Sequence, residues 1–156
     1  MNIFVLDKSP QQSAKWHCDR HVVKMILESA QLLCSVYHLK HSIDDIPYKL
    51  THKNHPCSIW ARESKQNFQW LLDLSYALCR EYTMRYGKIH KTQNVIIWCD
   101  IHKDQLIFDK NDMTPFPLAM PDTYKVDDPI QSYRNYYIHG KAHLHQWKQN
   151  KPDWIQ

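Results

Sequence analysis

Apolar residues recur every three or four positions over residues 19–38, and this pattern most constrains what the chain can fold into. A spacing close to 3.6 residues is typical of an amphipathic helix, which must bury its apolar stripe against other elements. The apolar positions are Val23, Ile26, Leu27, Ala30, Leu33, Cys34 and Tyr37. The opposite, polar face carries His17, His21, Lys24, Glu28 and Gln31.

Further helices are predicted on both sides of this one. Ser9-Pro10 and Asp128-Pro129 each combine a capping residue with a proline at the first helical position. A second, longer helix is predicted to begin at Pro56 and to end at Gly87, and a shorter one covers 93–102. The predicted buried positions of the last two long helices are Phe68, Leu71, Leu72, Ser75, Leu78, Cys79 and Tyr82, and then Tyr133, Tyr137, Leu144 and Trp147.

These patterns predict an all-α fold over 1–156: a compact single-domain helical bundle with a short extended N-terminal segment, residues 2–6. The tail, KPDWIQ, is expected to pack Trp154 back on the body. With 156 residues the chain has the size of one domain and is long enough to bury a core.

Composition excludes several classes of protein. The two glycines, Gly87 and Gly140, stand far apart, so glycine-rich phosphate loops and dinucleotide fingerprints are absent. Five widely spaced cysteines without a C-x-x-C motif favour a reducing compartment. The N-terminal sequence is unlike a signal peptide, and no apolar run is long enough to span a membrane. We therefore expect a cytoplasmic protein, in the host cell if phage-encoded, with no membrane partner.

The start of the first long helix is a candidate site. His17 and His21 share one face, as do Arg20 and Lys24, because each pair is four residues apart. Cations at a helix N-terminus oppose the helix dipole, and an anionic ligand such as phosphate would resolve that conflict. A merely solvated polar face is the alternative interpretation.

Three further segments combine basic and aromatic residues. Each segment also has a purely structural interpretation. Residues 52–62 could be a proline-led helix start, residues 85–91 could be basic residues that complement a helix C-terminus, and the tyrosines of 133–141 could be buried in the core. Interleaved cations and aromatic rings suit phosphate contact and base stacking, and the net charge of +4 permits a polyanionic partner. The predicted DNA-binding residues are Arg20, Lys24, His52, Lys53, Trp60, Arg62, Arg85, Lys88, His90, Lys91, Tyr133 and Arg134.

A metal site is a rival interpretation of the same residues. His17 and His21 could bind zinc together with His52, His55 or Cys57. The sequence has no third ligand at a diagnostic spacing, so we predict no metal and no cofactor. The functional alternatives are a metal-dependent nuclease or hydrolase, and a non-catalytic module that binds nucleic acid or a host factor.

The whole chain resembles the phage-type pyrimidine-dimer DNA glycosylases and AP lyases. The resemblance lies in arrangement: an apolar start, a helix bearing Arg20-His21-Val22-Val23-Lys24, a proline-led helix beginning HKNHPCSIW, and an aromatic, basic C-terminal part, YRNYYIHGKAHLHQW and KPDW. It implies a compact helical fold whose N-terminal amine attacks the sugar of a damaged or modified nucleotide. The family's catalytic glutamate is replaced by His21 in this alignment.

The resemblance therefore implies a DNA-binding enzyme of glycosylase/AP-lyase type. Because Asn2 is bulky, Met1 is retained, and its amine is the expected nucleophile. An α-amino group has an ordinary pKa of about 7.7–8.0, so a useful fraction is the free amine near neutral pH. His21, supported by His17 or His55, is expected to transfer protons.

Overall fold

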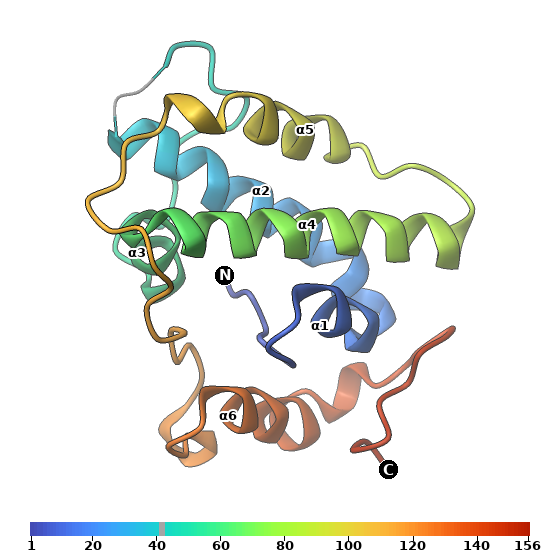
Figure 1. The fold of residues 1–156 in the computed structure, drawn as a ribbon. Helices are drawn as coiled ribbons and strands as arrows, with labels where there is room; N and C mark the ends of the chain where they lie inside the picture. The colour runs from blue at the N-terminus through green and yellow to red at the C-terminus, as the bar shows by residue number, and fades with distance from the viewer. Residues whose placement is uncertain (41–42) are drawn as a thin grey trace.

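The computed structural model describes residues 1–40 and 43–156, and within these ranges the chain forms six α-helices (Figure 1). They are α1 (Pro10–Trp16), α2 (Asp19–Lys40), α3 (Pro56–Glu63), α4 (Lys65–Tyr86), α5 (Gln93–Ile101) and α6 (Pro129–Asn135). Short 3₁₀ turns cover Lys103–Gln105, Asp122–Tyr124 and Ala142–Leu144, and a π-helical turn covers Tyr136–Gly140. No strand forms in the described ranges, so the all-α prediction is confirmed.

The centre of the molecule is α4, which packs against α1, α2, α3 and α5 (Figure 1). Buried apolar residues from these helices, from the N-terminal segment and from α6 form one hydrophobic cluster. Three predicted helix boundaries are confirmed. Ser9 caps α1 by accepting a hydrogen bond from the Gln12 backbone N–H, Asp128 caps α6, and Gly87 ends α4 with a left-handed φ of 70°.

The predicted continuous helix from Pro56 to Gly87 is wrong at one residue. Ser64 has an extended backbone, with φ −145° and ψ 158°, and it separates α3 from α4. Its hydroxyl accepts a hydrogen bond from the Asn67 N–H at 3.0 Å, and the Lys65 N–H donates to the Lys110 carbonyl at 3.0 Å. A serine side chain that competes for backbone N–H groups favours a cap over a helix interior, and α4 therefore starts afresh at this point.

Two further expectations are corrected. Val23 and Leu27, predicted on the buried stripe of α2, are 38% and 41% exposed. The last helix does not continue to Trp147. It ends at the π-helical turn Tyr136–Gly140. The Gly140 backbone lies against the Tyr136 ring there, and a Cβ at this position would be 2.5 Å from Tyr136 Cδ1.

The N-terminal segment, residues 2–6, is buried and runs beside α1, between α4 and α6 (Figure 1). It is not extended throughout, as the sequence predicted, because Phe4 has a left-handed φ of 38°. The Ser13 hydroxyl donates to the Phe4 carbonyl and accepts from the Leu6 N–H, both at 3.0 Å. Arg134 Nε donates to the Leu6 carbonyl at 2.9 Å. These contacts hold the first residue of the chain inside the body of the protein.

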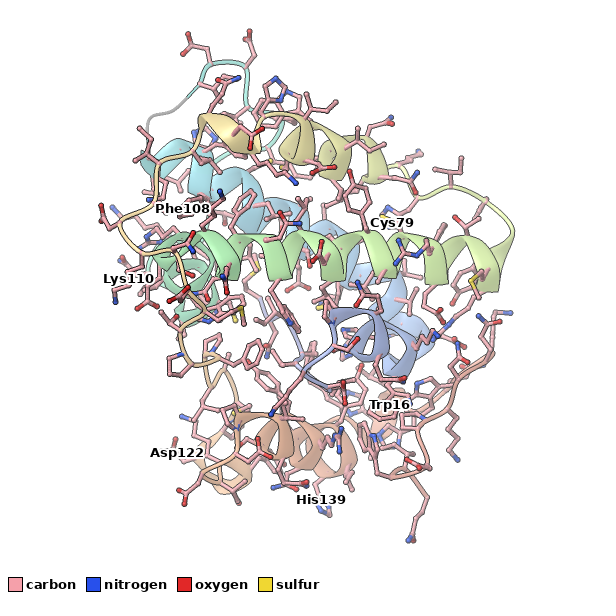
Figure 2. All side chains as sticks on the ribbon, in the orientation of Figure 1. Trp16, Cys79, Phe108, Lys110, Asp122 and His139 are labelled. Atoms are coloured by element: carbon pink, nitrogen blue, oxygen red, sulfur yellow. The ribbon has the colours of Figure 1, made fainter. Side chains whose placement is uncertain are left out.

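The C-terminal tail packs back on the body, as predicted. Trp154 meets Trp16 edge to face, with ring centroids 5.7 Å apart, and Trp16 lies between α1 and the C-terminal segment (Figure 2). The Arg134 guanidinium lies over both indoles, at 5.1 Å from Trp16 and 5.4 Å from Trp154. Within the described part of the chain, no helix has the length and apolar character needed to cross a lipid bilayer.

Candidate active site at the N-terminal amine

A small polar pocket of about 110 Å³ lies at the start of the chain. Three elements contribute to it: the N-terminal segment, α2, and the turn that follows α6. The lining residues are Met1, Asn2, Phe4, His21, Lys24, Met25, Glu28, Tyr136 and Lys141. The pocket therefore brings together the N-terminal amine, a carboxylate, an imidazole and two lysines from distant parts of the sequence.

A buried ion pair in this pocket joins the first residue of the chain to α2. The Met1 amino nitrogen lies 3.1 Å from Glu28 Oε1, and the two side chains are 3% and 8% exposed. Glu28 Oε2 is buried and has no hydrogen-bond partner among the described residues. Lys24 Nζ lies 3.7 Å from it. Glu28 thus presents one oxygen to the amine and keeps a second oxygen unbonded.

Helical spacing and Asn2 position these groups. His21, Lys24 and Glu28 are separated by three and four residues, so they line one face of α2. Asn2 anchors the chain start: Nδ2 donates to the Ala119 carbonyl at 2.7 Å, and Oδ1 accepts from the Ile3 N–H at 2.8 Å. The position of the Met1 amine is therefore set by the anchored Asn2 on one side and by the ion pair with Glu28 on the other.

His21 is a buried, neutral group. Its Nδ1 lies 2.6 Å from the Tyr137 hydroxyl, and its ring stacks on Phe4 with centroids 4.3 Å apart. Burial lowers the pKa of His21 to about 2, and electrostatic interactions with His17, Lys141 and Lys24 act in the same direction. An imidazole with so low a pKa stays neutral near pH 7, which disfavours the predicted proton transfer by His21 in the free protein.

The other two predicted catalytic histidines lie in different surroundings. His17 is 0% exposed, its Nδ1 is 2.6 Å from the Ser13 carbonyl, and burial lowers its pKa to about 4. It belongs to the core, so the histidine face predicted for His17 and His21 is buried and does not lie on the surface. His55 caps α3 by accepting from the Cys57 N–H at 3.0 Å. Burial lowers its pKa, and the nearby N-terminal charge adds to this effect, so His55 adjoins Met1 outside the pocket lining.

Arg85, predicted to bind DNA, is instead the centre of a buried ion-pair network. Its guanidinium contacts Asp19 Oδ1 and Glu81 Oε1, both at 3.0 Å, and donates to the backbone carbonyls of His17 and Lys15 at 2.8 Å. The packing of α1 and α2 against α4 buries this cation. The arginine joins three helices and is not available to a phosphate.

Trp60, Tyr133 and Arg134 are also engaged within the protein. The Trp60 indole is buried and donates to the Thr114 carbonyl at 3.2 Å. Tyr133 is fully buried, and its hydroxyl donates to the Pro117 carbonyl at 2.6 Å. Arg134 holds the N-terminal segment and lies over two indoles. The aromatic residues that the sequence suggested for base stacking are core residues here.

The remaining predicted DNA-binding residues lie at or near the surface. Arg62 donates to the Lys53 carbonyl at 2.7 Å, and His90 Nε2 is 3.0 Å from the Val23 carbonyl, so both are partly engaged. The exposed members of the set are Arg20, Lys24, His52, Lys53, Lys88 and Lys91. Arg20 lines a separate hollow of about 230 Å³ with His143 and His145, and so does not reach the amine pocket.

The sequence interpretation missed Glu28 and Lys141. Glu28 was placed on the polar face of α2, four residues after Lys24 and seven after His21, but no role was assigned to it. That spacing was the available signal. Lys141 follows the π-helical turn, and no local pattern indicates that it enters the same pocket as residue 1.

Neither residue geometry nor comparison with known proteins adds a second candidate site. Among the residues that the structure describes, no three histidine, cysteine, aspartate or glutamate side chains are grouped so that they could hold a metal ion. Searches against protein-family models, curated proteins and solved structures return no match for this chain.

Proposed function

We propose that the protein is a DNA-binding enzyme of glycosylase/AP-lyase type, which acts on a damaged or modified base through the Met1 amine. The observation that carries the proposal is the buried contact between the Met1 nitrogen and Glu28 Oε1 at 3.1 Å. An amine becomes a nucleophile only after it loses a proton, and an adjacent carboxylate with a free oxygen provides a place for that proton. Glu28 thus takes the role that the family resemblance had given to position 21.

The first half of the proposed reaction replaces the base by the amine. Glu28 accepts a proton from the Met1 ammonium, which frees the nitrogen lone pair. The nitrogen forms a bond to C1′ of the sugar while the bond from C1′ to the base breaks, and the base leaves with that electron pair and a proton from the nitrogen. Glu28 returns its proton to the ring oxygen as the ring opens, which leaves an imine between Met1 and C1′.

The second half cleaves the strand and restores the enzyme. The imine acidifies the hydrogens on C2′, and the Glu28 carboxylate takes one of them. The bond from C3′ to its oxygen then breaks, and the phosphate leaves with the electron pair. Water hydrolyses the imine and regenerates the free amine. On a substrate that has already lost its base, the same steps begin from the aldehyde.

His21 has a supporting role in this proposal. A neutral imidazole whose Nδ1 contacts the Tyr137 hydroxyl keeps its other nitrogen for a hydrogen bond to the substrate. Because its pKa is about 2, His21 carries no charge that would repel the lysines at the pocket. Exposed cations on the same side of α2, Arg20 and Lys24, are the proposed contacts for the DNA backbone.

Reductive trapping on duplex DNA with one abasic site tests this proposal. Borohydride should convert the imine into a stable cross-link with the wild-type protein. Trapping should be strongly reduced in Glu28→Gln and retained in Glu63→Gln, which alters a partly exposed carboxylate that contacts Lys110 and Thr114. DNA binding without any cross-link would refute the lyase assignment and leave a non-catalytic binding module.

A further inference from the structure

The amine pocket contains more positive than negative charge. The Met1 amine, Lys24 and Lys141 line it, and they face the single carboxylate of Glu28. His21 does not alter this balance, because burial keeps its imidazole neutral. Within the described ranges, Lys141 Nζ forms no ion pair and no hydrogen bond. A cation without a carboxylate partner beside a partly enclosed site favours an anionic ligand.

The backbone after α6 brings Lys141 to this place. The π-helical turn Tyr136–Gly140 ends directly before it, and π-helical turns are frequent at functional sites. Gly140 permits the turn because its backbone lies against the rings of Tyr136 and Tyr124; a Cβ would be 2.5 Å and 3.2 Å from them. A side chain at position 140 would push the turn, and Lys141 with it, away from the pocket.

Two aromatic rings hold the ammonium group without neutralising it. Lys141 Nζ lies 5.1 Å from the Tyr136 ring centroid and 5.9 Å from that of Phe4. Cation–π contacts orient an ammonium but leave its full charge and its N–H donors available. Lys24 supplies a second, exposed ammonium from α2.

We propose that Lys141, with Lys24, forms a phosphate subsite beside the Met1 amine, so that the site selects a sugar carbonyl that carries a neighbouring phosphate. This inference rests on the proposed function and names its substrate class: a phosphorylated sugar with a reactive C1, either within a polynucleotide or free. Binding of the phosphate at the subsite orients the sugar so that the Met1 amine can reach C1, the carbon that forms the imine.

Methionine methyl signals in NMR spectra provide a test that does not depend on activity. Met1 and Met25 line the pocket, whereas Met84 and Met113 lie elsewhere and are 62% and 39% exposed. In protein with ¹³C-labelled methionine methyl groups, inorganic phosphate at constant ionic strength should shift the Met1 and Met25 signals in a saturable manner. The Met84 and Met113 signals should not follow that curve. The chain has five methionines, and shifts that are equal at these four methyl groups, or that do not saturate, overturn the subsite.

Substitutions at position 141 assign the effect to its charge. Lys141→Gln should weaken phosphate binding at least tenfold, while Lys141→Arg, which keeps the cation, should retain it. Lys125→Gln removes an exposed lysine that pairs with Asp122 and serves as the matched control. Unchanged phosphate binding in Lys141→Gln contradicts the proposal, whatever its effect on stability.

Two ligands distinguish the source of the phosphate. If a short abasic oligonucleotide half-saturates the methyl shifts at a lower concentration than 2-deoxyribose 5-phosphate does, the subsite serves polynucleotides. The reverse order assigns it to free sugar phosphates. Different results would refute the phosphate subsite and the proposed lyase function. Cross-linking to abasic DNA without selective methyl shifts refutes only the subsite, and selective shifts without any cross-link refute only the lyase assignment.

Discussion

The amino nitrogen of Met1 and Oε1 of Glu28 lie 3.1 Å apart in a pocket that shields both side chains from solvent. The two residues are 27 positions apart in sequence, and α2 and the extended N-terminal segment bring them together. A carboxylate at this distance can accept a proton from the amine and can later remove one from the substrate. This contact is the basis of the predictions below.

Replacing Glu28 by glutamine should slow imine formation by about 10²–10⁴-fold, the usual contribution of a positioned general base. The substitution preserves shape and removes only the charge, and binding of abasic DNA should change little. Single-turnover borohydride trapping at pH 7, compared with Glu63→Gln, measures the effect. Trapping at the wild-type rate in Glu28→Gln would exclude Glu28 as the base.

The stability of the protein should fall steeply as the pH drops below about 6.5. The pKa values of His17 and His21 are lowered on folding to about 4 and about 2, because both imidazoles are buried. Between those values and 6.5 the unfolded chain binds more protons than the native protein, so the free energy of unfolding decreases with decreasing pH. At about 1.4 kcal/mol per pH unit for each histidine, the two together account for roughly 4–5 kcal/mol between pH 6 and pH 4.

Urea unfolding at pH 6 and pH 4 checks this prediction. In His21→Gln the difference between the two pH values should shrink by about half, since one of the two buried imidazoles is gone. His139→Gln, which alters an exposed histidine, should leave the difference unchanged. An equal loss of stability in the wild type and in His21→Gln would contradict the assignment of a buried, neutral His21.

Arg85→Met should destabilise the fold by about 3–5 kcal/mol, because it leaves Asp19 and Glu81 without the cation that they share. The exposed neighbour Arg80 provides the control, and Arg80→Met should change the free energy of unfolding by less than about 0.5 kcal/mol. Chemical denaturation measures both variants. A loss of DNA affinity in Arg85→Met without loss of stability would restore Arg85 to the binding surface.

Binding to duplex DNA should weaken steeply with salt, because cations that neutralise phosphates release counterions. Lys24→Ala should lower the slope of log K against log[salt] by about 1 and reduce affinity similarly for different sequences. Fluorescence anisotropy over a range of salt concentrations measures the slope, and Lys125→Ala is the control. Absence of DNA binding even at low salt would refute the nucleic-acid assignment.

The local features of the fold could largely be predicted from the sequence, and apart from the packing of Trp154 on the body its long-range contacts could not. Ser9-Pro10, Asp128-Pro129 and Gly87 define helix ends because each acts through bonds within a few residues. Ser64 was the exception, since its capping bond and its pairing with Lys110 compete with a periodic pattern that continues through it.

At the candidate site, too, local features could be predicted and long-range contacts could not. The polar face of α2 was visible in the sequence, but the burial of His21 depends on Phe4 and on Tyr137, a residue 116 positions away. Arg85 was interpreted as a surface cation, because its partner Asp19 lies 66 positions earlier in the chain. Charge and spacing predicted that His21, Lys24 and Glu28 share one face of α2, but not that this face meets Met1 and Lys141. The packing of helices then determined which of them face solvent and which of them meet the amine.

Peptide mapping of the borohydride-reduced adduct tests the central claim most directly. The pocket contains three amines, those of Met1, Lys24 and Lys141, so the position of the cross-link identifies the nucleophile. We predict that mass spectrometry finds the sugar remnant on the α-nitrogen of Met1, and that acetylation of the N-terminus abolishes the adduct. An adduct on Lys24 or Lys141, or one that persists after N-terminal acetylation, would contradict the account.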